Sequence, residues 1–139
     1  MEDLSLHIMD IIDNSISAQS SKITVKVIEN LKRDVLRIEI IDNGKGMNQG
    51  TARSAIDPFF TSKPGKRIGL GLSLLAQAAR ESGGKFKIKS EPNKGTKITA
   101  SFMISHPDRK PLGDIEETIY MLKKAHPEIS FRFNYKRKQ

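Results

Sequence analysis

The 139-residue sequence contains no cysteine, and this absence excludes disulfides, zinc–thiolate sites and thiol nucleophiles. It also lacks a long apolar run. The longest nearly apolar stretch, from Gly69 to Ala79, is too short and too rich in glycine to span a bilayer. Repeats and low-complexity segments are absent, and the acidic start Met1-Glu2-Asp3 is unlike a secretory signal peptide. We therefore expect a cytoplasmic domain that makes no membrane contact.

The composition is that of one globular domain with an excess of basic charge. Lys and Arg number 24 against 16 Asp and Glu, which gives a formal net charge of +8, and 37% of the residues are hydrophobic. Excess Lys and Arg attract phosphates whatever the fold. Because the chain has no basic stripe with interleaved aromatic residues, however, a nucleic-acid partner is not favoured.

Period-two alternation of apolar and polar residues predicts strands at 22–29, 35–41, 85–90 and 96–104. The short polar segments 30–34 and 91–95 then join two hairpins. Strands that are wetted on one face belong to a mostly antiparallel sheet with one covered side. We expect helices to supply that cover.

Helical periodicity predicts three helices, at 4–18, 70–82 and 114–125, and a late strand follows at 129–136. The expected fold class is α+β, a two-layer α/β sandwich in which helices cover one face of a mixed, mostly antiparallel sheet. We expect a core at 1–104 and a C-terminal extension at 105–139 packed on the same domain. The extension either lengthens the sheet or docks on a partner.

Two polar residues of the first predicted helix, Asp10 and Asn14, are four positions apart and point into the same space. An amide oxygen is a suitable neutral ligand for Mg²⁺, which completes its shell with water and phosphates. A carboxylate one turn earlier can orient or deprotonate a water molecule. The alternative reading is an ordinary polar helix face.

The second predicted strand runs into Asp42, and the glycines Gly44 and Gly46 follow, with Met47 after them. An Asp at the end of an apolar strand followed by two glycines suggests close approach of the backbone to a ligand. The alternative is a solvent-exposed turn, for which Asp, Asn and Gly are ordinary material.

A glycine-rich segment, Gly69-Leu70-Gly71, opens the second predicted helix. Free N–H groups and the helix dipole make such a helix start an anion site, to which Lys63 can add a positive charge. The segment matches neither the P-loop, which needs Gly-Lys-Ser/Thr, nor the dinucleotide fingerprint, which needs a third glycine.

Taken in order, these motifs resemble the GHKL ATPase superfamily, which includes gyrase, Hsp90, sensor histidine kinases and MutL and shares the Bergerat ATP-binding fold. The similarity covers roughly residues 4–104. The motifs that carry it are Asp10-x-x-x-Asn14, Asp42-x-Gly44-x-Gly46, Phe59-Phe60-Thr61-x-Lys63, Gly69-x-Gly71 and Gly95-Thr96.

The resemblance implies a role for each matching residue. Asn14 would be the Mg²⁺ ligand, and Asp42 would accept a hydrogen bond from the adenine amino group. The base would approach the backbone at Gly44 and Gly46 and pack against Met47. Thr96 would support the Asp42 end of the pocket through its hydroxyl. The implied ATP lid and phosphate contacts comprise Thr61, Lys63, Gly69, Leu70 and Gly71.

The resemblance leaves three functions open. The first is a kinase of the histidine or serine/threonine type that acts in trans on a separate protein, as expected of a stand-alone form with nine residues before Asp10. The second is a nucleotide-gated binding module with little turnover. The third is slow hydrolysis in the manner of gyrase or MutL, with Asp10 as the catalytic base in place of their longer Glu. His7 is expected to be structural rather than a phosphoacceptor. A homodimer is left open.

Overall fold

The computed structural model describes residues 3–48, 50–52 and 70–139. Along the chain, the described elements are α1 (Leu4–Ser17), β1 (Lys22–Asn30), β2 (Val35–Asp42), α3 (Leu70–Glu81), β3 (Phe86–Glu91), β4 (Gly95–Met103), α4 (Ile115–Ala125) and β5 (Ser130–Lys138). Every predicted helix and strand in this part of the chain is present, with ends that differ by one or two residues.

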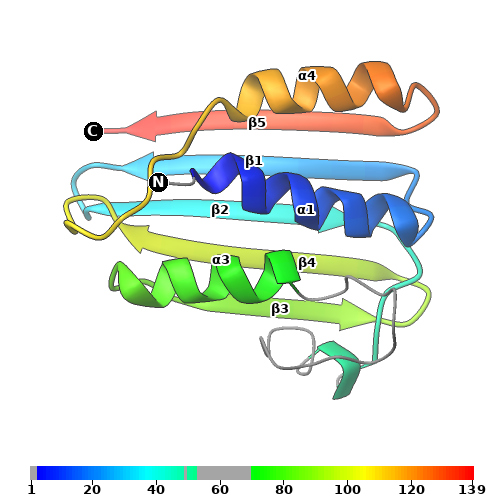
Figure 1. Ribbon diagram of the computed structural model, residues 1–139, viewed down its shortest axis with the longest axis horizontal. Helices are drawn as coiled ribbons and strands as arrows, with labels where there is room; N and C mark the ends of the chain where they lie inside the picture. The colour runs from blue at the N-terminus through cyan, green and yellow to red at the C-terminus, as the bar shows by residue number, and fades with distance from the viewer. Residues whose placement is uncertain (1–2, 49, 53–69) are drawn as a thin grey trace.

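The described strands form one five-stranded sheet in the order β3-β4-β2-β1-β5. Three of the pairings are antiparallel, and β5 runs parallel to β1. The helices α1, α3 and α4 lie on the same side of this sheet (Figure 1). The fold is therefore α+β, a two-layer sandwich with a mixed sheet, as the sequence predicted.

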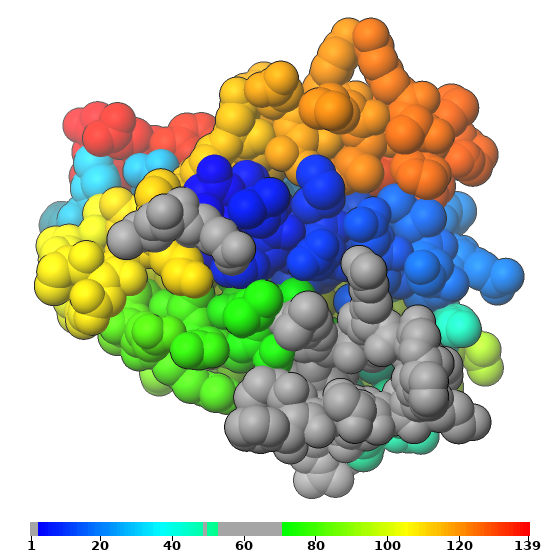
Figure 2. Space-filling model, viewed as in Figure 1, coloured from blue at the N-terminus to red at the C-terminus, as the bar shows by residue number. Residues whose placement is uncertain are grey.

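The core lies between the sheet and the three helices. Each strand turns alternate residues toward the helices, such as Ile38 and Ile40 of β2, which are each 1% exposed. The helices pack apolar stripes against these residues. On α1 the buried residues are Leu4, Ile8, Ile11 and Ile12, and on α3 they are Leu72, Leu75, Ala76 and Ala79. In Figure 2, α1 lies between α4 and α3 on this face of the molecule.

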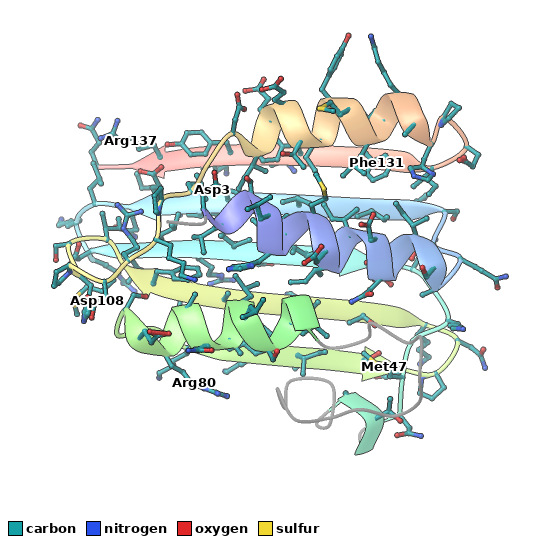
Figure 3. The ribbon with its side chains drawn as sticks, in the orientation of Figure 1. Asp3, Met47, Arg80, Asp108, Phe131 and Arg137 are labelled. Atoms are coloured by element: carbon teal, nitrogen blue, oxygen red, sulfur yellow. The ribbon has the colours of Figure 1, made fainter. Side chains whose placement is uncertain are left out.

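The segment that follows β4 joins the same sheet and the same core. The Asp114 side chain accepts a hydrogen bond from the Glu117 backbone N–H at 3.0 Å and caps α4. Ile115, Ile119 and Leu122 are buried beneath this helix, and Phe131 of β5 points into the same region (Figure 3). In the extension, β5 adds a strand to the sheet beside β1.

Candidate functional site

The carboxylate of Asp42, at the end of β2, is held by two donors from different parts of the chain. The Ser15 hydroxyl of α1 donates to Oδ2 at 2.5 Å, and the Gly44 backbone N–H donates to Oδ1 at 2.9 Å. Ser15 is buried, whereas Asp42 is half-buried. A carboxylate has about four lone-pair positions, so Asp42 is fixed in orientation and can still accept a further donor.

Two hydroxyl groups lie next to Asp42 on the neighbouring strands. Thr96 of β4 pairs with Asp42 in register, and Ser90 of β3 pairs with Thr96. The Ser90 and Thr96 hydroxyls share a hydrogen bond of 2.7 Å, and the Met47 N–H donates to Ser90 Oγ at 2.7 Å. Met47 accordingly lies beside the end of β3 (Figure 3). These groups form a polar corner at one end of the sheet.

A shallow hollow, open to solvent, lies at this corner. Its lining includes Asp42, Ser90 and Thr96 and continues round the end of the sheet to Lys89 and Lys97. The hollow thus follows the end of β3 and β4, with Asp42 at one side of it.

The loop after β2 is tied to the protein on both sides. The Lys45 N–H donates to the Ala18 carbonyl at 2.9 Å, and the Asn93 N–H donates to the Lys45 carbonyl at 2.6 Å. Gly46 has φ of +69°, and a Cβ there would come within 1.9 Å of the Glu91 carbonyl oxygen. The close approach that this glycine permits is thus to the β3–β4 turn of the protein itself.

Gly44 is also packed closely against other parts of the protein. A Cβ at this position would lie 2.8 Å from the Ala18 carbonyl oxygen and 2.7 Å from Ser20 Oγ, both in the turn after α1. Close packing inside the protein is sufficient to require glycine at both positions, whatever ligand the loop faces.

Asp10 lies on α1 beside the start of α3, and Asn14 lies one turn further along α1. Asp10 is exposed and Asn14 is half-buried. A Cβ at Gly71, in the first turn of α3, would be only 2.7 Å from Asp10 Cβ. The carboxylate-bearing turn of α1 therefore packs directly against the N-terminal turn of α3, where free N–H groups favour an anion.

The carboxyl group of the neighbouring Asp13 has a raised pKa. Partial burial raises the pKa of its carboxyl group, and the nearby Asp10 carboxylate raises it further, while His126 acts in the opposite direction. The charges that act on the Asp13 carboxyl group thus come from α1 and from the end of α4.

His7 is only 1% exposed. A phosphoacceptor must reach a phosphate donor in another molecule or domain, so this burial fits the structural role expected for His7 and not the phosphoacceptor alternative.

The sequence motifs do not indicate two of the hydroxyl groups at this corner. Ser15 lies among the buried residues of α1, and Ser90 lies near the end of β3. A serine at a core position of an amphipathic helix is the signal that could have revealed Ser15, because a buried hydroxyl needs a hydrogen-bond partner.

The predicted site residues Thr61, Lys63 and Gly69 lie outside the described residues, and Leu70 begins α3 without a described side chain. Within the described part of the chain, no three His, Asp or Glu side chains come together to hold a metal.

Comparison with known proteins matches the chain to one family. Residues 2–106 match the model of the histidine kinase-, DNA gyrase B- and HSP90-like ATPases. The sensor protein kinase FleS of Pseudomonas aeruginosa is 32% identical over 111 residues, covering 79% of this chain and 27% of FleS. The histidine-protein kinase ArlS of Staphylococcus aureus is 35% identical over 96 residues, covering 66% of this chain and 21% of ArlS.

Solved structures agree on the fold. The MutL ATPase domain of Aquifex aeolicus, complexed with ADP, superimposes with a TM-score of 0.61 at 13% identity, covering 96% of this chain and 60% of that one. The N-terminal domain of a DNA repair protein gives 0.60 at 19% identity, covering 98% and 50%. The chain spans only 16% to 27% of the length of the curated sensor proteins that resemble it. Because the family model matches residues 2–106 and the fold agrees, the chain belongs to the histidine kinase-, DNA gyrase B- and HSP90-like (GHKL) ATPases. The domains of this family bind ATP.

Proposed function

We propose that this domain binds Mg–ATP at the Asp42 corner and acts in trans, as a kinase or an ATP-dependent signalling subunit, on a separate protein. The observation that carries the proposal is the Asp42 carboxylate, held by Ser15 and Gly44 and open to one more donor. The similarity to sensor kinases such as FleS supports the signalling role.

In this proposal the adenine end of the nucleotide would bind beside the Asp42 carboxylate. The adenine amino group would donate to Asp42, and the Thr96 hydroxyl would support the same end of the pocket, held by its bond to Ser90. Met47 would pack against the base. The proposal therefore assigns recognition of the base to groups that the fold already orients, which keeps the entropic cost of binding low.

The phosphates would extend toward the α1–α3 contact. Asn14 would ligate Mg²⁺ through its amide oxygen, and water and phosphates would complete the shell, as is usual for this ion. The start of α3, with Gly71, would provide N–H groups to the phosphates. Thr61, Lys63, Gly69 and Leu70 are proposed as the lid.

Slow hydrolysis is a second candidate function, and the position of Asp10 favours it. Asp10 is exposed, and its Cβ lies against the first turn of α3. There it could orient a water molecule toward the terminal phosphate. Replacing Asp10 with Asn should abolish phosphate release while leaving ATP affinity within a few fold. Unchanged phosphate release would remove this role.

Titration calorimetry with ATP and ADP, each with and without Mg²⁺, tests the proposed site. We expect Mg²⁺-dependent binding that favours ATP. Asp42→Asn should abolish binding, because it replaces an acceptor by a group that can present a donor to the adenine amino group. Asp108→Asn, at an exposed loop carboxylate, is the matched control and should bind normally. Equal affinity of the two variants would refute the assignment of Asp42.

Transfer of labelled phosphate to a partner protein separates the kinase reading from the others. Phosphate found on Ser, Thr or His of the partner supports the kinase. ATP-dependent capture of the partner without transfer supports a nucleotide-gated module instead.

A further inference from the structure

The face of the sheet that points away from α1, α3 and α4 has no helix over it in the described part of the chain. Alternation along the strands fixes which side chains it presents. In β2, for example, Leu36, Ile38 and Ile40 face the helices, so Arg37, Glu39 and Ile41 lie on the other face. We call this surface the open face and assign its residues from the strand register.

Basic side chains from all five strands meet on the open face. Along each ladder, register partners point to the same side of the sheet. Thr24 pairs with Arg132 and Ile28 pairs with Lys136, which places the β5 cations on this side. The cations of the open face are Lys22, Lys26, Arg37, Lys87, Lys89, Lys97, Arg132, Lys136 and Lys138.

The carboxylates that the strand register places on this face do not offset that charge. Glu39 is 4% exposed and lies beneath two cations, with Arg37 Nη2 at 2.6 Å and Lys97 Nζ at 3.6 Å. Glu91 is paired with Lys94 at 3.3 Å. Lys89 and Lys97 are direct register partners, an arrangement in which like charges are destabilising. The open face therefore holds unbalanced positive charge at some cost to folding.

The cations form two bands with a neutral strip between them. One band lies on β3 and β4, and the other on β1 and β5, while β2 contributes the Arg37–Glu39 pair between them. With strands about 4.8 Å apart, β4 and β1 are separated by about 10 Å and β3 and β5 by about 19 Å. These distances bracket the approximately 12 Å width of the DNA major groove.

We propose that the open face binds the phosphate backbones of duplex DNA, with one band of cations on each strand, without reading sequence. Lysine predominates in both bands, and lysine is a point charge suited to single phosphates. Each band can neutralise the phosphates of one strand, and this contact carries no sequence information.

Other polyanionic partners fit this face less well. Protein interfaces are depleted in Lys and rely on aromatic anchors, and none of the aromatic residues of the described strands points to this face. The same lack disfavours single strands, which need stacking platforms. It also disfavours a membrane surface, for which Trp, Phe or Leu would enter the interface.

The experiment measures anisotropy of a fluorescein-labelled DNA duplex of random sequence, titrated with nucleotide-free protein over a series of salt concentrations. The test variant combines Lys87→Gln, Arg132→Gln and Lys136→Gln, which removes exposed cations from both bands. The matched control combines Arg80→Gln, Lys123→Gln and Lys124→Gln, exposed residues of α3 and α4 with the same change in net charge. Circular dichroism and thermal unfolding verify that both variants fold.

We expect the test variant to bind duplex about 100-fold more weakly at 0.1 M salt, and its salt dependence to decrease by about 0.9 per lost phosphate contact. The control should bind almost as tightly as the unchanged protein. Equal losses in the two variants would overturn the proposal, because they would reflect net charge alone. Tighter binding of single-stranded DNA, polyglutamate or phosphatidylserine vesicles than of duplex would also overturn it.

Discussion

Ser15 shows how one side chain can serve both the core and the site. It occupies a position in the buried stripe of α1, where an unpaired hydroxyl would cost about 1–3 kcal/mol. Its bond to Asp42 satisfies that hydroxyl and links the helix to the end of β2. The orientation of the Asp42 carboxylate thus depends on the packing of α1.

Replacing Ser15 with Ala should therefore weaken ATP binding about tenfold and lower the free energy of unfolding by about 1–2 kcal/mol, because Asp42 loses a charge-assisted hydrogen bond. Calorimetry and urea unfolding measure the two effects. Ser17→Ala, at an exposed position of the same helix, is the control. ATP affinity that is the same in both variants would show that Ser15 does not position Asp42.

At the scale of elements, the contact between α1 and α3 determines where the Asp10 turn lies. Gly71 lets the first turn of α3 approach α1 at Asp10, with only 2.7 Å between a Cβ placed at Gly71 and Asp10 Cβ. Because the clash is with a Cβ and not with the end of a flexible side chain, a larger residue must move one helix.

For Gly71→Ala we expect a loss of about 1–2 kcal/mol in the free energy of unfolding, since overpacking outweighs the higher helix propensity of Ala. ATP affinity should fall as well, because α3 moves away from Asp10. Thermal unfolding and calorimetry test this. At Gly50 the nearest atom to an added Cβ is 3.5 Å away, so Gly50→Ala should be neutral or slightly stabilising. A Gly71→Ala variant as stable as Gly50→Ala would contradict the packing argument.

In the whole molecule, the two faces of the sheet carry different kinds of side chain. The helix-facing side carries the core and the polar corner at Asp42, and the open face carries most of the cations of the strands. Glu39 is embedded among those cations. Burial alone would raise the pKa of the Glu39 carboxyl, but the hydrogen bond from Arg37 and the charges of Arg37, Lys97 and Lys26 outweigh it, and the net pKa is lowered.

A lowered pKa in the folded state means that the ionised Glu39 stabilises the fold at neutral pH. That stability is present above the unfolded pKa, at about pH 4 for a glutamate, and is lost as the pH falls through the lower folded value. Glu39→Gln should thus lower the free energy of unfolding at pH 7. The variant should also lose less of that free energy as the pH falls, as measured by urea unfolding over a pH series. The exposed Glu81→Gln variant should keep the acid decline of the unchanged protein. An identical decline in the Glu39 variant would refute the role of this ion pair.

The helices, the strands and the family can all be predicted from the amino-acid sequence. Period-two and helical patterns located the helices and strands because each element buries one face, and the ordered motifs around Asp10, Asn14 and Asp42 identified a GHKL domain. The alternation predicts that β5 is a strand, but it does not predict the parallel pairing with β1, because alternation carries no information about which strand lies next to it.

The contacts between distant residues follow only from the folded chain. Ser15 is 27 residues from Asp42 in sequence, so no local pattern could show that its hydroxyl holds the carboxylate. The same holds for Gly44 and Gly46, whose neighbours belong to other turns. The basic residues are scattered along the chain and form bands only when the strand register aligns them. Local periodicity fixes the direction of a side chain within its own element, whereas its partners depend on long-range pairing.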